Sequence, residues 1–211
     1  MLVSGAVILL CLVILLGMTF ALFTDTREVV NHLQAGSLQV TLKRTALEKT
    51  DLGDDGLLKT VTDKNTVNFT ASTTDDVNVF GILQTDRIVP GCKYTATMQI
   101  ENHGDVAFNY LVKVVCSDSK NGENLAKQLW VTMESNGYKA EGSVHDGVNL
   151  ENGENGYFGL VKVGEKTSFT VSVEFLDSLV TDGIGDNNAA KNQTVDFDLI
   201  VYAVQALKAP R

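Results

Sequence analysis

Apolar and polar residues alternate with a period of two through most of the chain beyond residue 33. In "TSFTVSVEF", residues 167–175, every second side chain is Phe or Val, and in "SLQVTL", residues 37–42, every second one is Leu or Val. Such alternation predicts strands with one buried face. Clusters of Gly, Asn and Asp, such as "LGDDG", "NHGD", "SNG", "ENGENG" and "TDGIGDNN", separate these segments and predict turns. The pattern predicts an all-β, jelly-roll-like β-sandwich.

The last long strand is expected in "TVDFDLIVYAV", residues 194–204. Its second half is apolar on both faces, which predicts a central position in a sheet. One face of this strand would carry Val195, Phe197, Leu199, Val201 and Ala203, and the other Asp196 and Asp198.

Residues 47–76 have a weaker pattern, rich in Thr, Asp and Asn, and are expected to form either a long loop or an edge hairpin.

A single segment, "NGENLAKQLW", predicts a helix. Asn121 could cap its start, and Leu125 and Leu129 would lie one turn apart on a common face. One short connector helix is therefore expected.

The first 21 residues resemble an export signal, because residues 2–16 are an almost unbroken apolar run without charge. Gly17 can break a helix there, and Thr19-Phe20-Ala21 offers a site with small residues on both sides of Phe20. Cleavage between Ala21 and Leu22 is expected. The alternative is a retained anchor, since the run from Gly5 to Phe23 approaches the roughly 20 residues of a membrane span.

The formal net charge of −9 falls entirely on residues 22–211, because residues 1–21 contain no ionisable side chain. Such a surface repels phosphate backbones, so no nucleic-acid partner is expected. Contact with a membrane is expected only through residues 1–21. The chain is thus divided into a signal peptide (1–21), an N-terminal arm (22–32) and a β-sandwich domain (33–207).

Removal of the leader would leave Cys92 and Cys116 as the only cysteines, and an exported pair of this kind predicts a disulfide. A hairpin centred on Gly104 would place Cys92 opposite Cys116. A sandwich corner at "NHGD" would instead put the two strands in facing sheets, where the thiols could meet across the core. Two buried free thiols are the remaining alternative.

Motifs of catalysis are lacking in the sequence. The three histidines are scattered and none lies in HExxH, and there is no G-x-S-x-G, P-loop or dinucleotide motif. We therefore expect no enzyme activity, no catalytic residues, no cofactor and no metal centre. Acidic turns beginning at Asp75, Glu151 and Asp182 could offer oxygen ligands to calcium, although none follows the EF-hand order.

Several blocks, taken in order, resemble the TasA/camelysin family. They are the leader followed by "ALFTDTREVVNHLQAGSLQVTL", then "IVPGCKYTATMQIENHGDVAFNYLVKVV", "NLAKQLWVTM" and "NQTVDFDLIVYAVQ". The resemblance implies an exported jelly-roll-like protein of the cell surface or biofilm matrix, processed by a SipW-type signal peptidase. Some members polymerise into fibres, and part of the family carries a metallopeptidase label.

The resemblance also implies a role for the arm. In family fibres the equivalent segment inserts as a donor strand into the next subunit, so the expected partner is a second copy in a head-to-tail homopolymer. Leader cleavage would then free the arm and start assembly. The alternatives are a first strand of the same sandwich or a disordered tail in a monomeric, membrane-anchored adhesion or ligand-binding protein. The donor-strand residues would be Leu22, Phe23, Thr24, Asp25, Thr26, Val29 and Val30.

Overall fold

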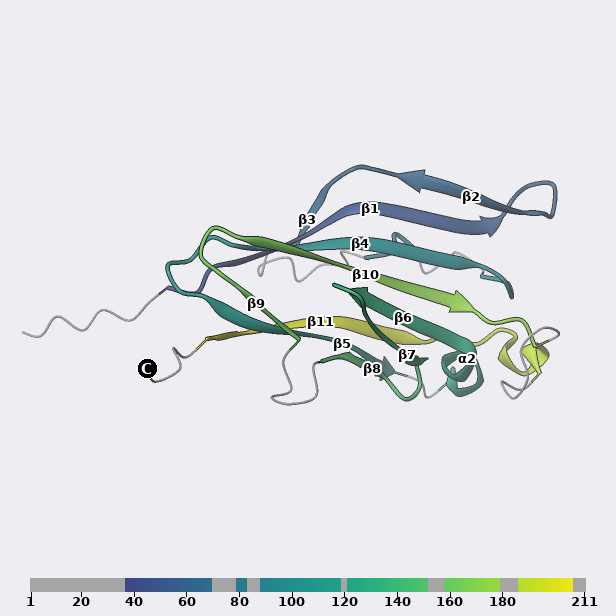
Figure 1. Cartoon of the computed structure of the whole chain (residues 1–211). Coiled ribbons are helices and arrows are strands. Elements are labelled where there is room, and N and C mark those ends of the chain that lie inside the picture. The colour runs from purple at the N-terminus through teal and green to yellow at the C-terminus, as the bar shows by residue number, and fades with distance from the viewer. Residues whose placement is uncertain are drawn as a thin grey trace, which may run out of the picture. The chain divides into compact units, whose positions relative to one another are not determined.

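The computed structural model describes residues 37–69, 79–82, 88–118, 121–151, 158–178 and 186–206. All of them belong to the second of two compact units, Gly36–Arg211. Strands make up most of this unit and form two antiparallel sheets (Figure 1). The predicted all-β sandwich with one short connector helix is confirmed, whereas the N-terminal hydrophobic segment lies outside the described residues.

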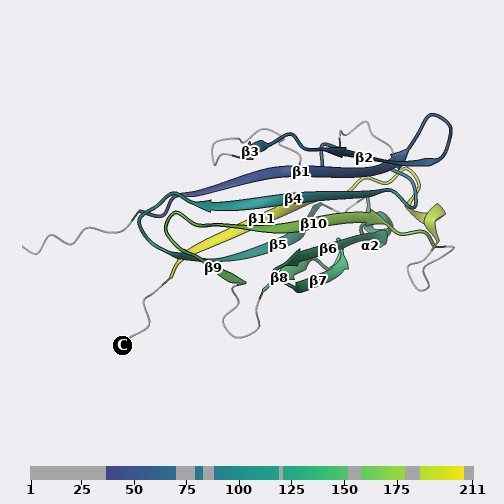
Figure 2. The ribbon, with the colours of Figure 1, turned by 45° about the horizontal axis from the view of Figure 1, so that its top comes forward.

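The larger sheet has the strand order β2-β1-β4-β10-β6-β7, with β3 also paired to β1. Figure 2 shows β1, β4, β10, β6 and β7 following one another across this sheet. The hairpin of β1 and β2 lies at its edge, which confirms the edge-hairpin alternative for the described part of residues 47–76. The strands are β1 (Val40–Leu52), β2 (Leu58–Asp63), β3 (Val67–Phe69), β4 (Lys93–Asn102), β6 (Leu129–Ser135), β7 (Tyr138–Ser143) and β10 (Lys166–Phe175).

The smaller sheet has the order β11-β5-β8, and β9 pairs with β5 as well. Among the described strands, β11 therefore lies at an edge of its sheet, which differs from the predicted central position. A strand with apolar residues on both faces can still lie at the edge of a sheet, because its outer face can stay exposed to solvent. Tyr202, on that outer face, is 47% exposed. The strands are β5 (Phe108–Asp118), β8 (Val148–Leu150), β9 (Gly159–Val161) and β11 (Asp196–Gln205).

The core lies between the two sheets and is built by the alternating residues that the sequence predicts. On β10, the side chains of Phe169, Val171, Val173 and Phe175 are all buried. The inner face of β4 faces that of β5 across the core, and its side chains are equally well covered. The largest fully buried side chains include Tyr110, Phe108, Phe169, Met98, Ile100, Met133 and Leu150.

The turn "NHGD" is a corner between the sheets and not a hairpin, since β4 pairs with β1 and β10 while β5 pairs with β11, β8 and β9. Asn102, which is 1% exposed, holds this corner. Its side-chain amide donates to the carbonyl oxygens of Val106 (2.9 Å) and Val161 (3.1 Å), and its oxygen accepts from Gly104 N–H at 3.0 Å. The Gly104-centred hairpin is thus wrong, and the sandwich-corner alternative is confirmed.

The connector helix α2 (Glu123–Gln128) is present, but it starts later than predicted. Its N-cap is Gly122 and no side chain caps it, so Asn121 does not have the expected role. A Cβ at Gly122 would lie 1.9 Å from the carbonyl oxygen of Thr194, which explains the glycine. Leu129 already has extended backbone and begins β6. A short 3₁₀ helix, η1 (Asn187–Ala190), precedes the last strand.

Candidate assembly site at the β11 edge

β11 is ten residues long and, among the described residues, pairs on one side only, with β5. The N–H of Ala206 donates to the carbonyl oxygen of Ala107 at 2.9 Å. Ala206 and Ala107 follow the pair Gln205–Phe108 and are therefore a hydrogen-bonded pair. Hydrogen-bonded and non-hydrogen-bonded pairs alternate in antiparallel strands. The backbone groups of Leu199, Val201 and Ala203 therefore point away from β5, toward the free edge. Unpaired groups in such a row are a template for an added strand.

The inner face of β11 is covered less well than that of its neighbour. On β5, Phe108, Tyr110, Val112 and Val114 are all fully or almost fully buried. On β11, the inner residues pack against the same core but remain only partly buried, and they are Phe197, Leu199, Val201 and Ala203. Apolar side chains next to a free edge gain further burial when a strand is added there.

Within the described residues, the two sheets differ in width. At one side β8 lies against β6 and β7. At the other side the larger sheet continues through β1 and β2, whereas the smaller sheet ends at β11. We call this side of the sandwich, between the inner face of β1 and the edge of β11, the open side, and Val79–Ile82 covers part of it.

The segment Val79–Ile82 lies across the open side. Arg44 of β1 donates from Nη1 to the carbonyl oxygen of Val79 at 2.8 Å, and Lys49 donates from Nζ to that of Gly81 at 2.7 Å. The ring of Phe80, between these two residues, faces Phe197 of β11 with 6.1 Å between centroids. This segment thus contacts both β1 and β11.

The chain enters the sandwich at the corner that joins the sheets. Ser37 N–H donates to a carboxylate oxygen of Asp105, and His103 N–H donates to the carbonyl oxygen of Gln39 at 2.8 Å. A Cβ at Gly104 would lie 2.2 Å from the Ser37 carbonyl oxygen, so only glycine allows this approach. Ser37 is therefore held against this corner at the start of β1.

The predicted cleavage residues Ala21 and Leu22 lie outside the described residues. The same holds for the remaining donor-strand residues, Phe23, Thr24, Asp25, Thr26, Val29 and Val30. The structure thus describes the edge of β11 and not the arm. Sequence reasoning missed this edge because it placed the last strand in the middle of a sheet.

The predicted disulfide is not formed, since Cys92 and Cys116 are both free. Cys92 directly precedes β4 of the larger sheet, and Cys116 lies on β5 of the smaller one. Cys92 is fully buried and its thiol donates to Asp51 Oδ1 at 3.3 Å, whereas Cys116 is only partly buried.

Asp51 accepts three hydrogen bonds at the end of β1. Besides the Cys92 thiol, the Tyr94 hydroxyl donates to Oδ2 at 3.0 Å and Leu52 N–H donates to Oδ1 at 2.8 Å. Burial by itself would raise the pKa of Asp51, but these hydrogen bonds and the charge of Lys49 outweigh it, and the pKa lies below its usual value. Burial, followed by the contact with Asp51, raises the pKa of Cys92, so its thiol stays protonated.

Side chains that could bind a metal do not gather in the described part of the chain, where no three His, Cys, Asp or Glu residues are suitably grouped. His103 lies 3.1 Å from Glu101, and His145 lies 2.9 Å from Asp146. Asp186 of the third candidate calcium turn accepts a hydrogen bond from Asn188 N–H at 2.9 Å. Most residues of the three calcium turns are outside the described ranges.

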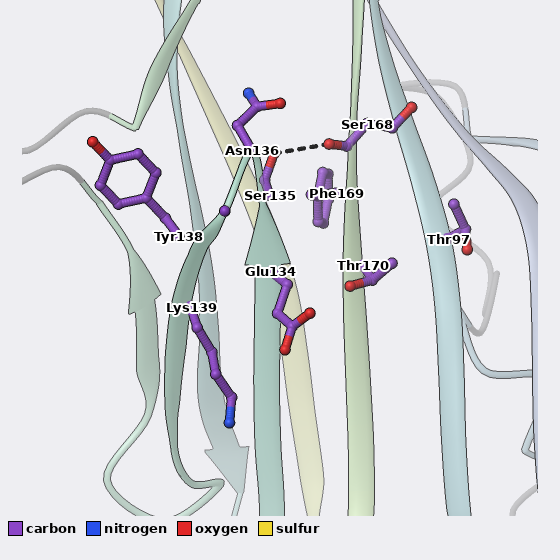
Figure 3. A pocket seen from close by; sticks show the side chains of 10 residues that line it. Thr97, Glu134, Ser135, Asn136, Tyr138, Lys139, Ser168, Phe169 and Thr170 are labelled. Atoms are coloured by element: carbon purple, nitrogen blue, oxygen red, sulfur yellow. Dashed lines mark hydrogen bonds between the residues drawn. The ribbon is translucent and has the colours of Figure 1, made fainter.

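A hollow of about 450 Å³ lies where the β6–β7 hairpin meets the outer face of the larger sheet (Figure 3). Hydroxyl groups of Thr97, Ser168 and Thr170 line it, together with the charged Glu134 and Lys139. The Ser135 hydroxyl donates to the Ser168 carbonyl oxygen at 2.8 Å and joins the two strands below it. The hollow is lined by residues of β4, β10 and the β6–β7 hairpin, and none of them belongs to β11.

Among the described helices, none is long and apolar enough to cross a membrane. A scan against models of known protein families finds no match, and no curated protein sequence matches the chain.

Proposed function

We propose that this chain is an exported structural protein of the cell surface or biofilm matrix that polymerises head to tail after its leader is cleaved. The N-terminal arm, residues 22–30, of one subunit adds as a strand to the free edge of β11 in the next. The observation that carries this proposal is the edge itself: ten residues long, paired on one side only among the described strands, with an inner face only partly covered.

The chemistry of the arm fits this acceptor. Leu22 and Phe23 at its start and Val29 and Val30 at its end are apolar, and the residues between them are hydrophilic. Backbone hydrogen bonds to the edge would supply affinity, and half-covered side chains of β11 would supply pockets for alternate side chains of the arm. Because donor and acceptor are different surfaces, the contact does not close on itself and produces a filament.

The experiment compares a chain of residues 22–211 with one that begins at Asn31, by negative-stain microscopy and light scattering. The proposal expects filaments from the longer chain only, while both show the same circular dichroism spectrum. Filaments from both chains, or from neither while both are folded, would contradict it.

The hollow beside the β6–β7 hairpin favours a second candidate, a ligand-binding sandwich held on the membrane by an uncleaved leader. Mass spectrometry of the cell-associated protein separates the two candidates, because a retained leader leaves no free arm.

A further inference from the structure

β2 is an edge strand of the larger sheet, and the core does not cover it (Figure 1). It pairs with β1 and, among the described strands, with no other. The side chains of residues 58–62 are all exposed. Val61 is 65% exposed although it points to the same side of the sheet as Leu47 of β1, which is buried in the core. An apolar side chain in the middle of an uncovered edge gains burial when another strand is added there.

The backbone of β2 has donors and acceptors that point away from β1. The hairpin closes with a hydrogen bond from Gly53 N–H to the Leu57 carbonyl oxygen at 2.8 Å, which makes these two residues a hydrogen-bonded pair. Hydrogen-bonded and non-hydrogen-bonded pairs alternate in antiparallel strands. Counted along the register from this pair, Val61 directs its backbone groups to β1. The backbone groups of Thr60 and Thr62 therefore point to the free edge.

One charge of each sign flanks Val61 on the same face of β2, Lys59 two residues before it and Asp63 two residues after it. Lys59 Nζ lies 3.0 Å from Asp55 Oδ2 in the adjoining turn, and both side chains are about half exposed. Such an exposed ion pair is weak. Asp63 accepts a hydrogen bond from Asn65 N–H at 2.9 Å and forms no ion pair within the described residues. The segment "KTVTD" is thus complementary in charge to its own reverse.

A second copy of β2 fits this edge when the two strands run antiparallel about a two-fold axis at Val61. Lys59 of each copy then lies opposite Asp63 of the other, and Thr60 forms a hydrogen-bonded pair with Thr62. The two Val61 residues form a non-hydrogen-bonded pair, in which side chains are closest. An axis at Thr60 would place Lys59 opposite Val61, and an axis at Thr62 would place Asp63 there. Only the axis at Val61 pairs the opposite charges.

We propose that two copies of this chain associate through their β2 strands, in an antiparallel pair centred on Val61. The contact joins the two larger sheets into one continuous sheet, with a Lys59–Asp63 ion pair on each side of the axis. It uses the same surface on both copies and closes on itself. It therefore goes beyond the head-to-tail contact at β11 and does not depend on it. Where filaments form, the same contact would join two of them side by side.

The two charges also select the partner. Lysine on an edge strand normally discourages the addition of another strand, because the added strand must cover or displace the charge. A second copy in the register centred on Val61 instead supplies a carboxylate opposite Lys59. A strand without an acidic residue at that position leaves the ammonium group without this partner. The contact thus favours a second copy of this chain over an unrelated strand.

Val61→Cys tests the axis by disulfide crosslinking, in the chain of residues 22–211 with Cys116→Ser. Opposite residues of a non-hydrogen-bonded pair have Cα atoms about 4.5 Å apart, a distance that a disulfide spans. Mild oxidation should therefore give a covalent dimer on non-reducing electrophoresis. Leu57→Cys is the matched control, because Leu57 is equally exposed, at 66%. The two Leu57 residues would lie about 26 Å apart along the paired strands, so this variant should crosslink at least tenfold more slowly.

Two charge reversals, each added to Val61→Cys, test the ion pairs. Lys59→Asp places two carboxylates opposite each other, and Asp63→Lys places two ammonium groups together. Each reversal alone should slow crosslinking at least tenfold. Mixed in equal amounts, the two chains should crosslink to each other at nearly the original rate, because every charge then meets its opposite. Lys64→Asp is the matched control, since it makes the same change of charge next to the pairs, and it should change the rate less than twofold.

The outcomes distinguish this inference from the proposed function. Equal crosslinking of Val61→Cys and Leu57→Cys, with circular dichroism showing both folded, would overturn the β2 contact whether or not filaments form. Failure of the mixed reversals to restore crosslinking would overturn the register centred on Val61. Specific crosslinking at Val61 without filaments would support the β2 contact and count against assembly at β11.

Discussion

The rings of Phe80 and Phe197 lie 6.1 Å apart between centroids, at an interplanar angle of 48°. Phe80 belongs to the segment across the open side, and Phe197 begins the inner face of β11. Their contact joins the edge strand to residues that β1 also holds through hydrogen bonds. The geometry of the proposed acceptor therefore depends on this pair.

Phe80→Ala should lower the free energy of unfolding by about 3–5 kcal/mol, because Phe80 is 3% exposed and its removal leaves a cavity. Phe197→Ala should cost less, since Phe197 is only partly buried. A double-mutant cycle by urea denaturation should give a coupling of about 1 kcal/mol between the rings. Strictly additive effects would show that the contact contributes nothing.

Gly104→Ala should destabilise the domain by about 2 kcal/mol, because the new Cβ would lie 2.2 Å from the Ser37 carbonyl oxygen and 2.8 Å from Gln39 N. Gly137→Ala is the matched control. Gly137 has a φ of 81° but open space around it, so it should show only conformational strain of about 1 kcal/mol. Thermal unfolding of both variants gives the comparison, and equal losses would contradict the close approach at the corner.

The two cysteines should differ in reactivity. Cys92 is buried and its pKa is raised by burial, so iodoacetamide should modify it slowly in the native protein. Cys116, partly exposed, should react first. Peptide mass spectrometry after timed alkylation measures both rates. A Cys92–Cys116 disulfide in the untreated protein would show instead that the sequence expectation was right.

Asp51 should make the domain sensitive to acid. Its folded pKa lies below the ordinary value of 3.8, so its contribution to stability is present above that pH and is lost as the pH falls through the folded pKa. Asp51→Asn should cost about 1 kcal/mol at pH 7 and less at pH 2. Urea midpoints of both proteins across this range should converge toward low pH, and a constant difference would contradict the assignment.

Ala203→Pro should block filament growth without unfolding the domain. The N–H of Ala203 points to the free edge, so proline removes a donor for the incoming arm while the hydrogen bonds to β5 remain. Ala203→Val, which keeps the N–H, should assemble like the wild type. Sedimentation of filaments and circular dichroism of the soluble protein measure the two effects, and normal filaments from the proline variant would exclude this edge.

Alternation in the sequence was sufficient to predict which residues face the core, because burial follows the period of a strand whatever its partners are. It could not predict the partners. The inner faces of β4 and β5 are the same in a hairpin and in two facing sheets, so only the pairing of the two strands with other strands distinguishes the two. The free edge of β11 was missed because alternation does not show on which sides a strand is paired.

The burial of Arg44, which is 7% exposed, could not be predicted from the sequence. Next to Lys43 this residue forms an ordinary basic pair, and strict alternation does not reveal the register shift that follows it. Its burial depends on pairing with Met98, more than 50 residues away in the chain, which no local pattern encodes. The donor-strand prediction for residues 22–30 stays a prediction, because these residues lie outside the described ranges.

The most direct measurement is hydrogen exchange of the β11 amides, compared between monomers and filaments of the processed chain. In the monomer, the N–H groups of Ile200 and Tyr202 should be protected by β5, while those of Leu199, Val201 and Ala203 exchange fast. In the filament, the account predicts that these three become protected. Filaments in which they still exchange as fast as in the monomer would contradict strand addition at the β11 edge.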